Sequence, residues 1–341
     1  MPCNRNILLF TLIALAVVVF FCLDVLIGSE SLALKDIWAA ITGRGAGDDM
    51  VTSIVRRWRI PKALTAGAAG AALAASGLQM QTLFRNPLAG PFVLGVSSGA
   101  SLGVAVFLMG MPLLGLPLAG DAVRNLGIVG SAWVGGAAVL LIIMAVSARV
   151  KDIMAILILG IMFGSAATAV VEILQFLAPE GSVKSFAVWT MGSFGHVTTS
   201  QLAVLLPFVL AGLALSVFLI KPLNTLLLGE NYARTMGQSV RRTRAAIFVS
   251  TILLAGSVTA FCGPIGFVGI AVPHLARMIF ADADHRVLMP ASILLGAAVM
   301  LLCDMISQLP GYNIVLPINT ITALLGIPIV IVVIVRNRKI F

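Results

Sequence analysis

The sequence has few charged residues, and this scarcity argues against a soluble fold. Only 10% of its residues are charged, whereas 60% are hydrophobic and the mean hydropathy is +1.10. Soluble domains carry about 25% charged residues, so most of this 341-residue chain is predicted to lie in lipid. The formal net charge of +9 would suggest nucleic acid in a soluble protein. Basic loops are ordinary in membrane proteins, so we expect no nucleic-acid partner.

Several chemical motifs are also missing. The four cysteines form no CxxC pair, so neither a disulfide framework nor a metal site is expected. No Gly-Lys pair occurs, and the chain therefore lacks the GxxxxGK[ST] loop that holds nucleotide phosphates. It also lacks an HExxH motif and a pair of aspartates in the middle of a span. We therefore predict no catalytic residues and no cofactor bound by this chain.

Long apolar segments are abundant instead. A membrane-spanning helix needs roughly 20 apolar residues, and none of the segments shows the alternation of a β-barrel. We predict an all-α polytopic membrane protein with a single transmembrane domain over residues 1–341, its first segment being a retained anchor. The seventh and eighth of the ten candidate spans are separated only by Cys262, Gly263 and Pro264. The candidates are 7–27, 63–83, 92–111, 126–148, 153–178, 201–220, 245–262, 264–280, 288–307 and 317–335.

The distribution of Lys and Arg predicts the orientation. Ten spans place both termini on one side, and most basic residues fall in the inner loops if that side is cytoplasmic. One basic cluster breaks this bias, because it falls in an outer segment. Its members are Lys35, Arg44, Arg56, Arg57, Arg59 and Lys62.

The stretch RNPLAGPFVLGVSSGA (85–100) interrupts two apolar runs. Pro87 disfavours helical geometry at Asn86, so the second span must end there. Pro91 fits the first turn of the next helix, where a missing N–H costs nothing. The spacing of Gly95, Gly99 and Gly103 is typical of close helix packing in lipid. The stretch is therefore a tight turn between two helices.

A second polar interruption, LLLGENYARTMGQSVRRTR, begins at Leu226. Glu230 lies where a helix N-terminus favours negative charge, and Gly237 suits a helix C-terminal cap. These residues predict a short polar helix within a segment of about 226–243. From local rules alone, the segment is either a solvated loop or a docking element for a partner.

Several motifs, in order, resemble the FecCD-type permease subunits of ABC importers for iron chelates, haem and cobalamin. The resemblance covers about 55 to 341, and the first helix also fits. The motifs are RIPKALTAGAAGAALAASGLQMQ (59–81), the 85–100 stretch, WTMGSFG (189–195), LLLGENYARTMG (226–237), GPIGFVGIAVPHLAR (263–277), DHRVLMP (284–290) and LPINTITALLGIPIVIVVI (316–334).

The resemblance implies the type II ABC importer permease fold. It implies a homodimer in the bacterial inner membrane, with both termini cytoplasmic. Two ATP-binding cassette subunits would bind inside and use ATP and Mg²⁺, while a periplasmic or lipid-anchored substrate-binding protein would dock outside. The cargo would be a ferric siderophore or haem, and cobalamin is the alternative. A single-chain secondary transporter is a rival of another class, but its intramembrane acids are scarce here.

The resemblance also implies roles for particular residues. Asn86 and Leu88 would narrow the path at its cytoplasmic end. A second constriction would fall at Lys151, Asp152 and Ile153, where the family often has small hydroxyl residues. The coupling and docking residues are a longer set. Coupling to the ATPase would use Gly229, Glu230, Ala233, Arg234 and Gly237, and docking of the binding protein would use Arg56, Arg59 and Lys62.

The roles of three histidines and one glutamate are also predicted. His196, His274 and His285 are expected to be structural rather than haem ligands. Glu172 is the acidic residue that we expect to face an aqueous path, because its helix precedes the WTMGSFG turn. An acidic residue at the bilayer centre is costly, by about 2.5 to 3.5 kcal/mol on insertion scales.

Overall fold

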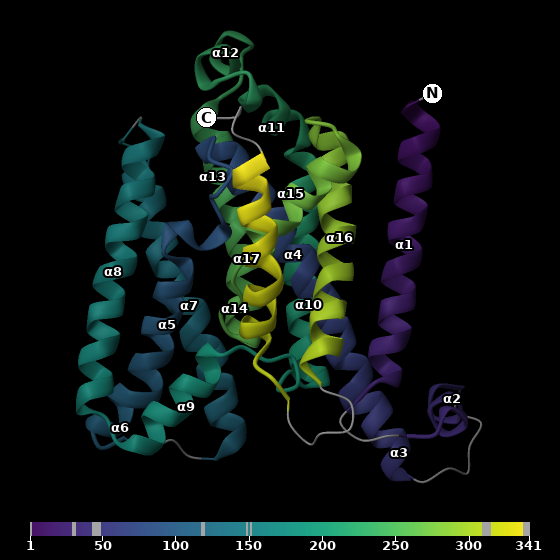
Figure 1. Ribbon diagram of the computed structural model, residues 1–341. Coiled ribbons are helices and arrows are strands. Elements are labelled where there is room, and N and C mark those ends of the chain that lie inside the picture. Colours follow the sequence, from purple (N-terminus) through teal and green to yellow (C-terminus); the bar gives the residue numbers. More distant parts are fainter. Residues whose placement is uncertain are drawn as a thin grey trace.

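A computed structural model of the protein is shown in Figure 1, and it describes residues 2–28, 32–42, 49–116, 120–147, 149–150, 152–308 and 315–336. Within these ranges every regular element is a helix, which confirms the predicted all-α class. Long helices run side by side between two ends of the molecule, and short helices lie at those ends.

Each of the ten predicted spans overlaps a long helix or a run of consecutive helices. Seven of the described helices are long and apolar enough to cross a membrane, while α15 and the apolar part of α17 are shorter; a count of ten spans is consistent with this structure. The long elements are α1 (Pro2–Leu26), α4 (Ile60–Phe84), η2–α5–η3–α6 (Pro91–Leu94, Val96–Ala105, Val106–Gly110, Met111–Leu113), α7 (Asp121–Ser147), α8 (Ile153–Leu177), α10 (Thr199–Phe218), α13–η4–α14 (Val240–Thr251, Ile252–Gly256, Ser257–Cys262), α15 (Val268–Phe280), α16 (His285–Ser307) and α17 (Ile318–Arg336). The short elements are α2 (Leu34–Thr42), α3 (Asp49–Ile54), η1 (Val55–Arg59), α9 (Glu180–Thr190), α11 (Ile220–Leu227) and α12 (Glu230–Thr235).

Helix α4 is the centre of the bundle. Almost all of its residues from Ala63 to Phe84 are buried, and it packs against α10, α15 and α16. Two helix backbones can approach this closely only where the contacting residues are glycines. A Cβ atom on Gly77 would lie 1.8 Å from the carbonyl oxygen of Gly269 in α15. The small residues of α4 therefore serve helix packing, as expected in lipid.

The glycine stripe of α5 has the same purpose. A Cβ atom on Gly103 would lie 2.0 Å from the carbonyl oxygen of Ser131 in α7, and one on Gly99 would lie 2.6 Å from that of Gly135. Helices α5, α7 and α8 form a second group beside the α4 group (Figure 1). The predicted packing role of Gly99 and Gly103 is confirmed.

The two ends of the molecule differ in what they carry. Helix α12 lies at one end, where α1 also begins and α17 ends (Figure 1); we call this the α12 end. Helices α2, α3 and α9 lie at the opposite end, which we call the α9 end. The positions of α1 and α17 agree with the predicted placement of both termini on one side.

A buried ionic cluster joins α1, α4 and α16 near the α9 end. The ammonium of Lys62 lies 2.7 Å from Asp304 Oδ2 and 3.4 Å from Asp24 Oδ1. The amide of Gln308 donates to Asp24 Oδ1 at 2.9 Å and to Asp304 Oδ2 at 3.2 Å. Asp24 is fully buried, and its Oδ2 has no hydrogen-bond partner among the described residues. Two carboxylates thus surround one ammonium in an apolar setting.

This cluster gives Lys62 a structural role beside the predicted one of docking an external protein, which stays a prediction. Its side chain is only 14% exposed and is paired with two acidic residues of its own chain. An ion taken out of water must be compensated by opposite charge and hydrogen bonds, and Lys62 provides that compensation for Asp24 and Asp304. Lys62 therefore links α1, α4 and α16 in the folded protein.

We predict that Lys62→Met destabilises the protein by about 3 kcal/mol, because removing one partner leaves buried carboxylates uncompensated. In contrast, Asp24→Asn should change the stability by less than about 1 kcal/mol, since one ammonium and one carboxylate remain paired. Thermal unfolding in lipid nanodiscs measures both changes. Lys35→Met, on the exposed surface of α2, is the matched control, and equal losses in Lys62→Met and Lys35→Met would contradict the structural role.

Candidate functional site

The turn after α4 is built by local hydrogen bonds. Arg85 adopts a left-handed conformation with φ 49°. Its N–H bonds to the carbonyl of Thr82, and the N–H of Asn86 bonds to that of Gln81 at 3.2 Å. This pattern is the Schellman motif that ends many helices. The helix thus ends at Phe84, and Pro91 opens η2, as its fixed φ angle predicted.

Asn86 and Leu88 have different roles in this turn. Asn86 Oδ1 accepts a 2.9 Å hydrogen bond from the N–H of Leu88, so the Asn86 side chain holds the turn itself. The side chain of Leu88 is 37% exposed, although its neighbours Ala89 and Gly90 are buried. Of the two residues predicted to narrow a path, Leu88 is the one that projects from the protein.

Two side chains of helix α15 hold the turn in place by hydrogen bonds. His274 Nε2 lies 2.8 Å from the carbonyl oxygen of Pro87, and Arg277 donates to Gln81 Oε1 at 2.5 Å. The Gln81 amide in turn donates to the carbonyl of Ile270 at 3.2 Å. The side chain of His274 is therefore used in structure, as expected.

A second network holds α4, α11 and α16 together at this end. His285 Nε2 lies 2.8 Å from Thr82 Oγ1, and its Nδ1 lies 2.8 Å from Asn224 Oδ1. Asn224 also donates to Asp284 Oδ1 at 2.5 Å. The backbone N–H of Arg286 donates to Asp284 and holds the pKa of that carboxyl below its ordinary value. His285 is thus a structural histidine as well.

The predicted polar helix forms as α12 at the end of the molecule. Glu230 occupies its first turn, and Gly237, with φ 81°, terminates it. The N–H groups of Gly237 and Gln238 bond to the carbonyls of Arg234 and Ala233, each at 3.0 Å, which repeats the Schellman pattern. The helical and capping roles that local rules gave to Glu230 and Gly237 are confirmed.

Burial corrects part of the predicted coupling set. Ala233 is 0% exposed, so it seats α12 on the bundle and is not available to contact a partner. Glu230 binds Arg244 of α13 through its carboxylate, with Arg234 at 3.7 Å from its other oxygen. Arg234 and Gly237 are the exposed members of the predicted set. Other exposed residues of the segment are Leu227, Leu228, Asn231, Tyr232, Thr235, Met236, Ser239, Arg241 and Arg242.

Arg85 connects the turn to the α11–α12 segment. Its guanidinium Nη2 donates to the carbonyl oxygen of Leu226 at 3.4 Å. The same nitrogen would lie 2.7 Å from a Cβ atom on Gly229, whose φ of 113° also excludes most other residues. Sequence analysis did not single out Arg85, because its contact is 141 residues away.

The start of α8 also reaches this connection. Asp152 caps α8 by accepting a 2.9 Å hydrogen bond from the N–H of Met154. Asp152 and Ile153 line a cavity of about 500 Å³ together with Arg85, Gly229 and Glu230. Lys151, the third residue of the predicted second constriction, lies outside the described residues. The cavity brings the turn, the coupling segment and the start of α8 to one place.

The predicted docking residues at the α9 end are engaged within the chain. Arg59 is 6% exposed and donates to the carbonyls of Val25 and Leu26 at the end of α1. Arg56 is exposed, and its Nε donates to the carbonyl of Ala40 in the last turn of α2 at 2.7 Å. Together with the pairing of Lys62, this placement commits Arg59 and Lys62 to contacts within the chain, and their role in docking stays a prediction. Basic side chains near helix C-termini satisfy carbonyls that have no partner in the helix.

Glu172 lines a cavity between α8 and the η2–α5 segment. The cavity has a volume of about 400 Å³, and Ser98, Ser165 and Thr168 line it as well. Ser165 and Thr168 donate to carbonyls of their own helix at 3.1 and 3.0 Å, so their oxygens still accept hydrogen bonds. Ser165, Thr168 and Glu172 lie at positions i, i+3 and i+7 and therefore share one helix face. This spacing was a readable signal that sequence analysis missed.

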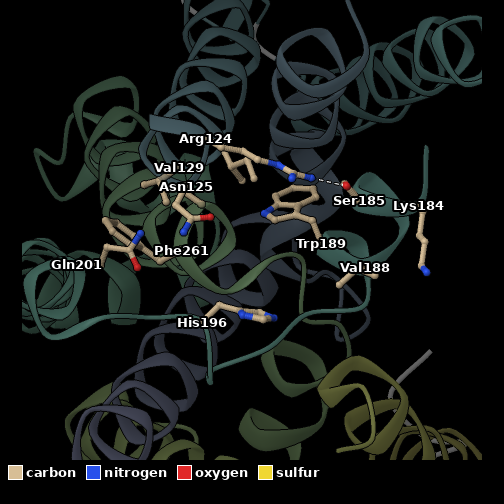
Figure 2. Close-up of a pocket in the computed structure, with 12 residues that line it drawn as sticks. Arg124, Asn125, Val129, Lys184, Ser185, Val188, Trp189, His196, Gln201 and Phe261 are labelled. Atoms are coloured by element: carbon tan, nitrogen blue, oxygen red, sulfur yellow. Dashed lines mark hydrogen bonds between the residues drawn. The ribbon is translucent and has the colours of Figure 1, made fainter. Parts of the chain in front are cut away.

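A larger cavity of about 520 Å³ opens at the α9 end (Figure 2). The first turns of α7, helix α9, the loop before α10 and the end of α14 enclose it. Arg124 donates to Ser185 Oγ across it, and the indole ring of Trp189 lies next to both side chains (Figure 2). Sequence analysis did not predict this site, because four separate segments build it.

One sequence pattern in α5 resembles a catalytic motif. Gly95 to Gly99 reads G-V-S-S-G, which fits the G-x-S-x-G spacing of hydrolases. The motif requires a turn between a strand and a helix, whereas Ser97 lies inside α5. The pattern therefore gives no nucleophile in this fold.

Known proteins resemble this chain over nearly its whole length. The FecCD transport family matches residues 15–336. The chain is 34% identical over 313 residues to the hemin transport system permease protein HmuU of Yersinia pestis, covering 92% of this chain and 90% of HmuU. It is 32% identical over 340 residues to the vitamin B12 import system permease protein BtuC of Salmonella paratyphi A, covering 98% and 97% of the two chains.

A solved structure agrees with the sequence relatives. It is an ABC transporter assigned to the metal-chelate type, in an inward-facing conformation, and it covers 96% of this chain and 98% of its own. The TM-score is 0.82 at 28% identity. This likeness supports the predicted type II permease fold. Because the family matches residues 15–336 and the relatives exceed 30% identity across nearly full length, the chain belongs to the FecCD transport family and is a permease of an ABC importer.

Proposed function

We propose that the chain forms, as a homodimer, the path of an iron chelate across the bacterial inner membrane. The cargo is a ferric siderophore or haem, with cobalamin as the alternative that the relative BtuC favours. Two ATPase subunits supply the energy from the cytoplasmic side, and a substrate-binding protein delivers the cargo from outside. Family membership weighs against the rival interpretation of a single-chain secondary transporter.

The observation that carries the proposal is the bond between Arg85 and Leu226. It connects the exposed α12 segment, which is the surface that an ATPase can reach, with the turn from which Leu88 projects. A movement of α12 therefore pulls on the turn through a charged hydrogen bond. Coupling in this form needs no nucleotide site in the chain itself, in line with its missing phosphate loop.

The polar face of α8 supports a water-filled path. Glu172, Ser165 and Thr168 are exposed on α8, next to exposed apolar side chains such as Ile161 and Phe176. An intramembrane carboxylate is costly against lipid, so this face is better explained by an aqueous space between two copies. In alternating access, ATP binding would close the ATPase pair and open one end of that space, and hydrolysis would reset it.

Uptake by the reconstituted complex tests the function. Proteoliposomes that contain permease, ATPase and binding protein should accumulate labelled haem or ferric siderophore only when ATP is supplied. Permease alone should hydrolyse no ATP, because it lacks the phosphate loop. Failure to transport haem, ferric siderophore and cobalamin would overturn the proposal.

A cysteine at the turn tests the homodimer. Leu88→Cys, in a Cys3→Ser, Cys22→Ser background, should form a disulfide between two copies in at least one nucleotide state. The control is Leu64→Cys, because Leu64 is exposed to a similar degree, 39% against 37%, but lies far along α4 from the turn. Cross-linking at position 64 but never at position 88 would contradict a gate at this turn.

Arg85→Ala should uncouple hydrolysis from transport. We expect uptake per ATP hydrolysed to fall about tenfold, since a hydrogen bond to a charged group is worth roughly 1.5 kcal/mol or more. The ATPase rate itself should change little, because Arg85 contacts neither nucleotide nor the exposed face of α12. Arg286→Ala, an exposed basic residue at the same end, serves as the control. An unchanged transport-to-hydrolysis ratio in Arg85→Ala would refute the link.

A further inference from the structure

We propose that the cavity beside Trp189 is a receiving site for an anionic, aromatic metal chelate. The inference rests on the proposed function and names its substrate class: a planar chelate with carboxylates, such as haem, rather than cobalamin, whose periphery carries amides. The cavity lies at the α9 end, opposite the exposed α12 segment (Figure 1). Cargo that arrives from outside would meet this end first.

The polar lining of the cavity selects for negative charge. Arg124 and Lys184 bring positive charge, and none of the described residues that line the cavity is acidic. Arginine has five N–H donors, so its bond to Ser185 fixes the guanidinium and leaves donors for a ligand. Asn125 and Gln201 add amide groups that can donate as well (Figure 2). A carboxylate is the ligand group that such a set recognises.

Trp189 supplies the second, independent observation. Its indole Nε1 is buried and has no hydrogen-bond partner among the described residues. An unsatisfied buried donor costs free energy. Trp189 lines the cavity, and in Figure 2 its indole nitrogen lies on the side of Asn125, so a rotation of the ring toward the cavity would let this donor bind a ligand oxygen.

The walls and the size fit a flat aromatic body. The ring of Trp189 and the ring of Phe261 border the cavity, with Ile128, Val129 and Val188 between the polar groups. Its volume of about 520 Å³ falls within the range of about 300–1,000 Å³ for ligand pockets. An apolar body with charged edges matches this combination of rings and basic side chains.

The neighbouring cavity at the same end does not compete for the anion. It has a volume of about 550 Å³ and shares His196 with the first cavity. Its basic residues are Arg59, which donates to the carbonyls of Val25 and Leu26, and Lys62, which is paired with Asp24 and Asp304. Asp304 lines this cavity as well. Positive charge without an acidic neighbour in the lining is therefore a property of the Trp189 cavity.

The test compares two ligands on matched variants. Equilibrium binding of hemin and of hemin dimethyl ester is measured on the permease–ATPase complex in nanodiscs, without ATP and without binding protein, with empty nanodiscs subtracted. Wild type should bind hemin about tenfold or more tightly than the ester. Arg124→Gln with Lys184→Gln should lose that preference, and Trp189→Phe should weaken hemin binding about threefold or more.

The control removes two positive charges at the same end outside the cavity. Lys35→Gln with Arg57→Gln, both exposed, should keep the preference, which separates local contacts from the overall field. Basal ATPase activity reports folding of each variant. If the Arg124 variant does not fold, Lys184→Gln alone must still reduce the preference, because Lys184 is exposed.

The outcomes separate this inference from the proposed function. Hemin binding that is equal in wild type and both cavity variants would overturn the receiving site, while ATP-driven uptake of haem or siderophore would leave the function standing. Uptake of cobalamin alone would overturn the substrate class. Loss of the preference in the cavity variants, with the control unchanged, supports the site.

Discussion

The need to satisfy every backbone polar group within the protein governs this structure. Lipid offers no water to the N–H and C=O groups that a broken helix exposes, so each interruption must be repaired by other parts of the chain. The turn after α4 shows how this is done. Gln81 and Thr82 accept the free N–H groups of Arg85 and Asn86, and His274 reaches the carbonyl of Pro87 from α15.

The hydrogen bonds that complete one helix end also link it to other helices at the α12 end. The guanidinium of Arg85 donates to the carbonyl of Leu226, which also accepts the N–H of Gly229, and His285 joins Thr82 to Asn224. The residues that complete one helix end thus belong to another helix. Helix α12 itself is seated by Ala233 and held by the Glu230–Arg244 pair, so it is fixed to the bundle next to the segment that Arg85 contacts.

Local signals in the sequence were enough to predict the interruptions. Pro87 and Pro91 fix where α4 ends and η2 begins, while Glu230 and Gly237 fix the ends of α12. The partners of charged residues could not be predicted in this way. Lys62 has the same local pattern whether it faces a docking protein or two buried carboxylates, and the acids that decide the matter come from α1 and α16. The Trp189 cavity escaped prediction for the same reason.

The two ends of the molecule use basic residues for different purposes, and this difference explains the charges that break the positive-inside bias. At the α9 end, Arg56 and Arg59 complete the carbonyl ends of α2 and α1, and Lys62 neutralises acids. These charges form hydrogen bonds and ion pairs within the protein, so they do not by themselves indicate an acidic binding partner outside. Arg124 and Lys184 are different, because no acid shares their cavity. Positive charge with no acidic residue among the described residues of the lining, beside a buried indole N–H with no partner among the described residues, suits this cavity to an anion.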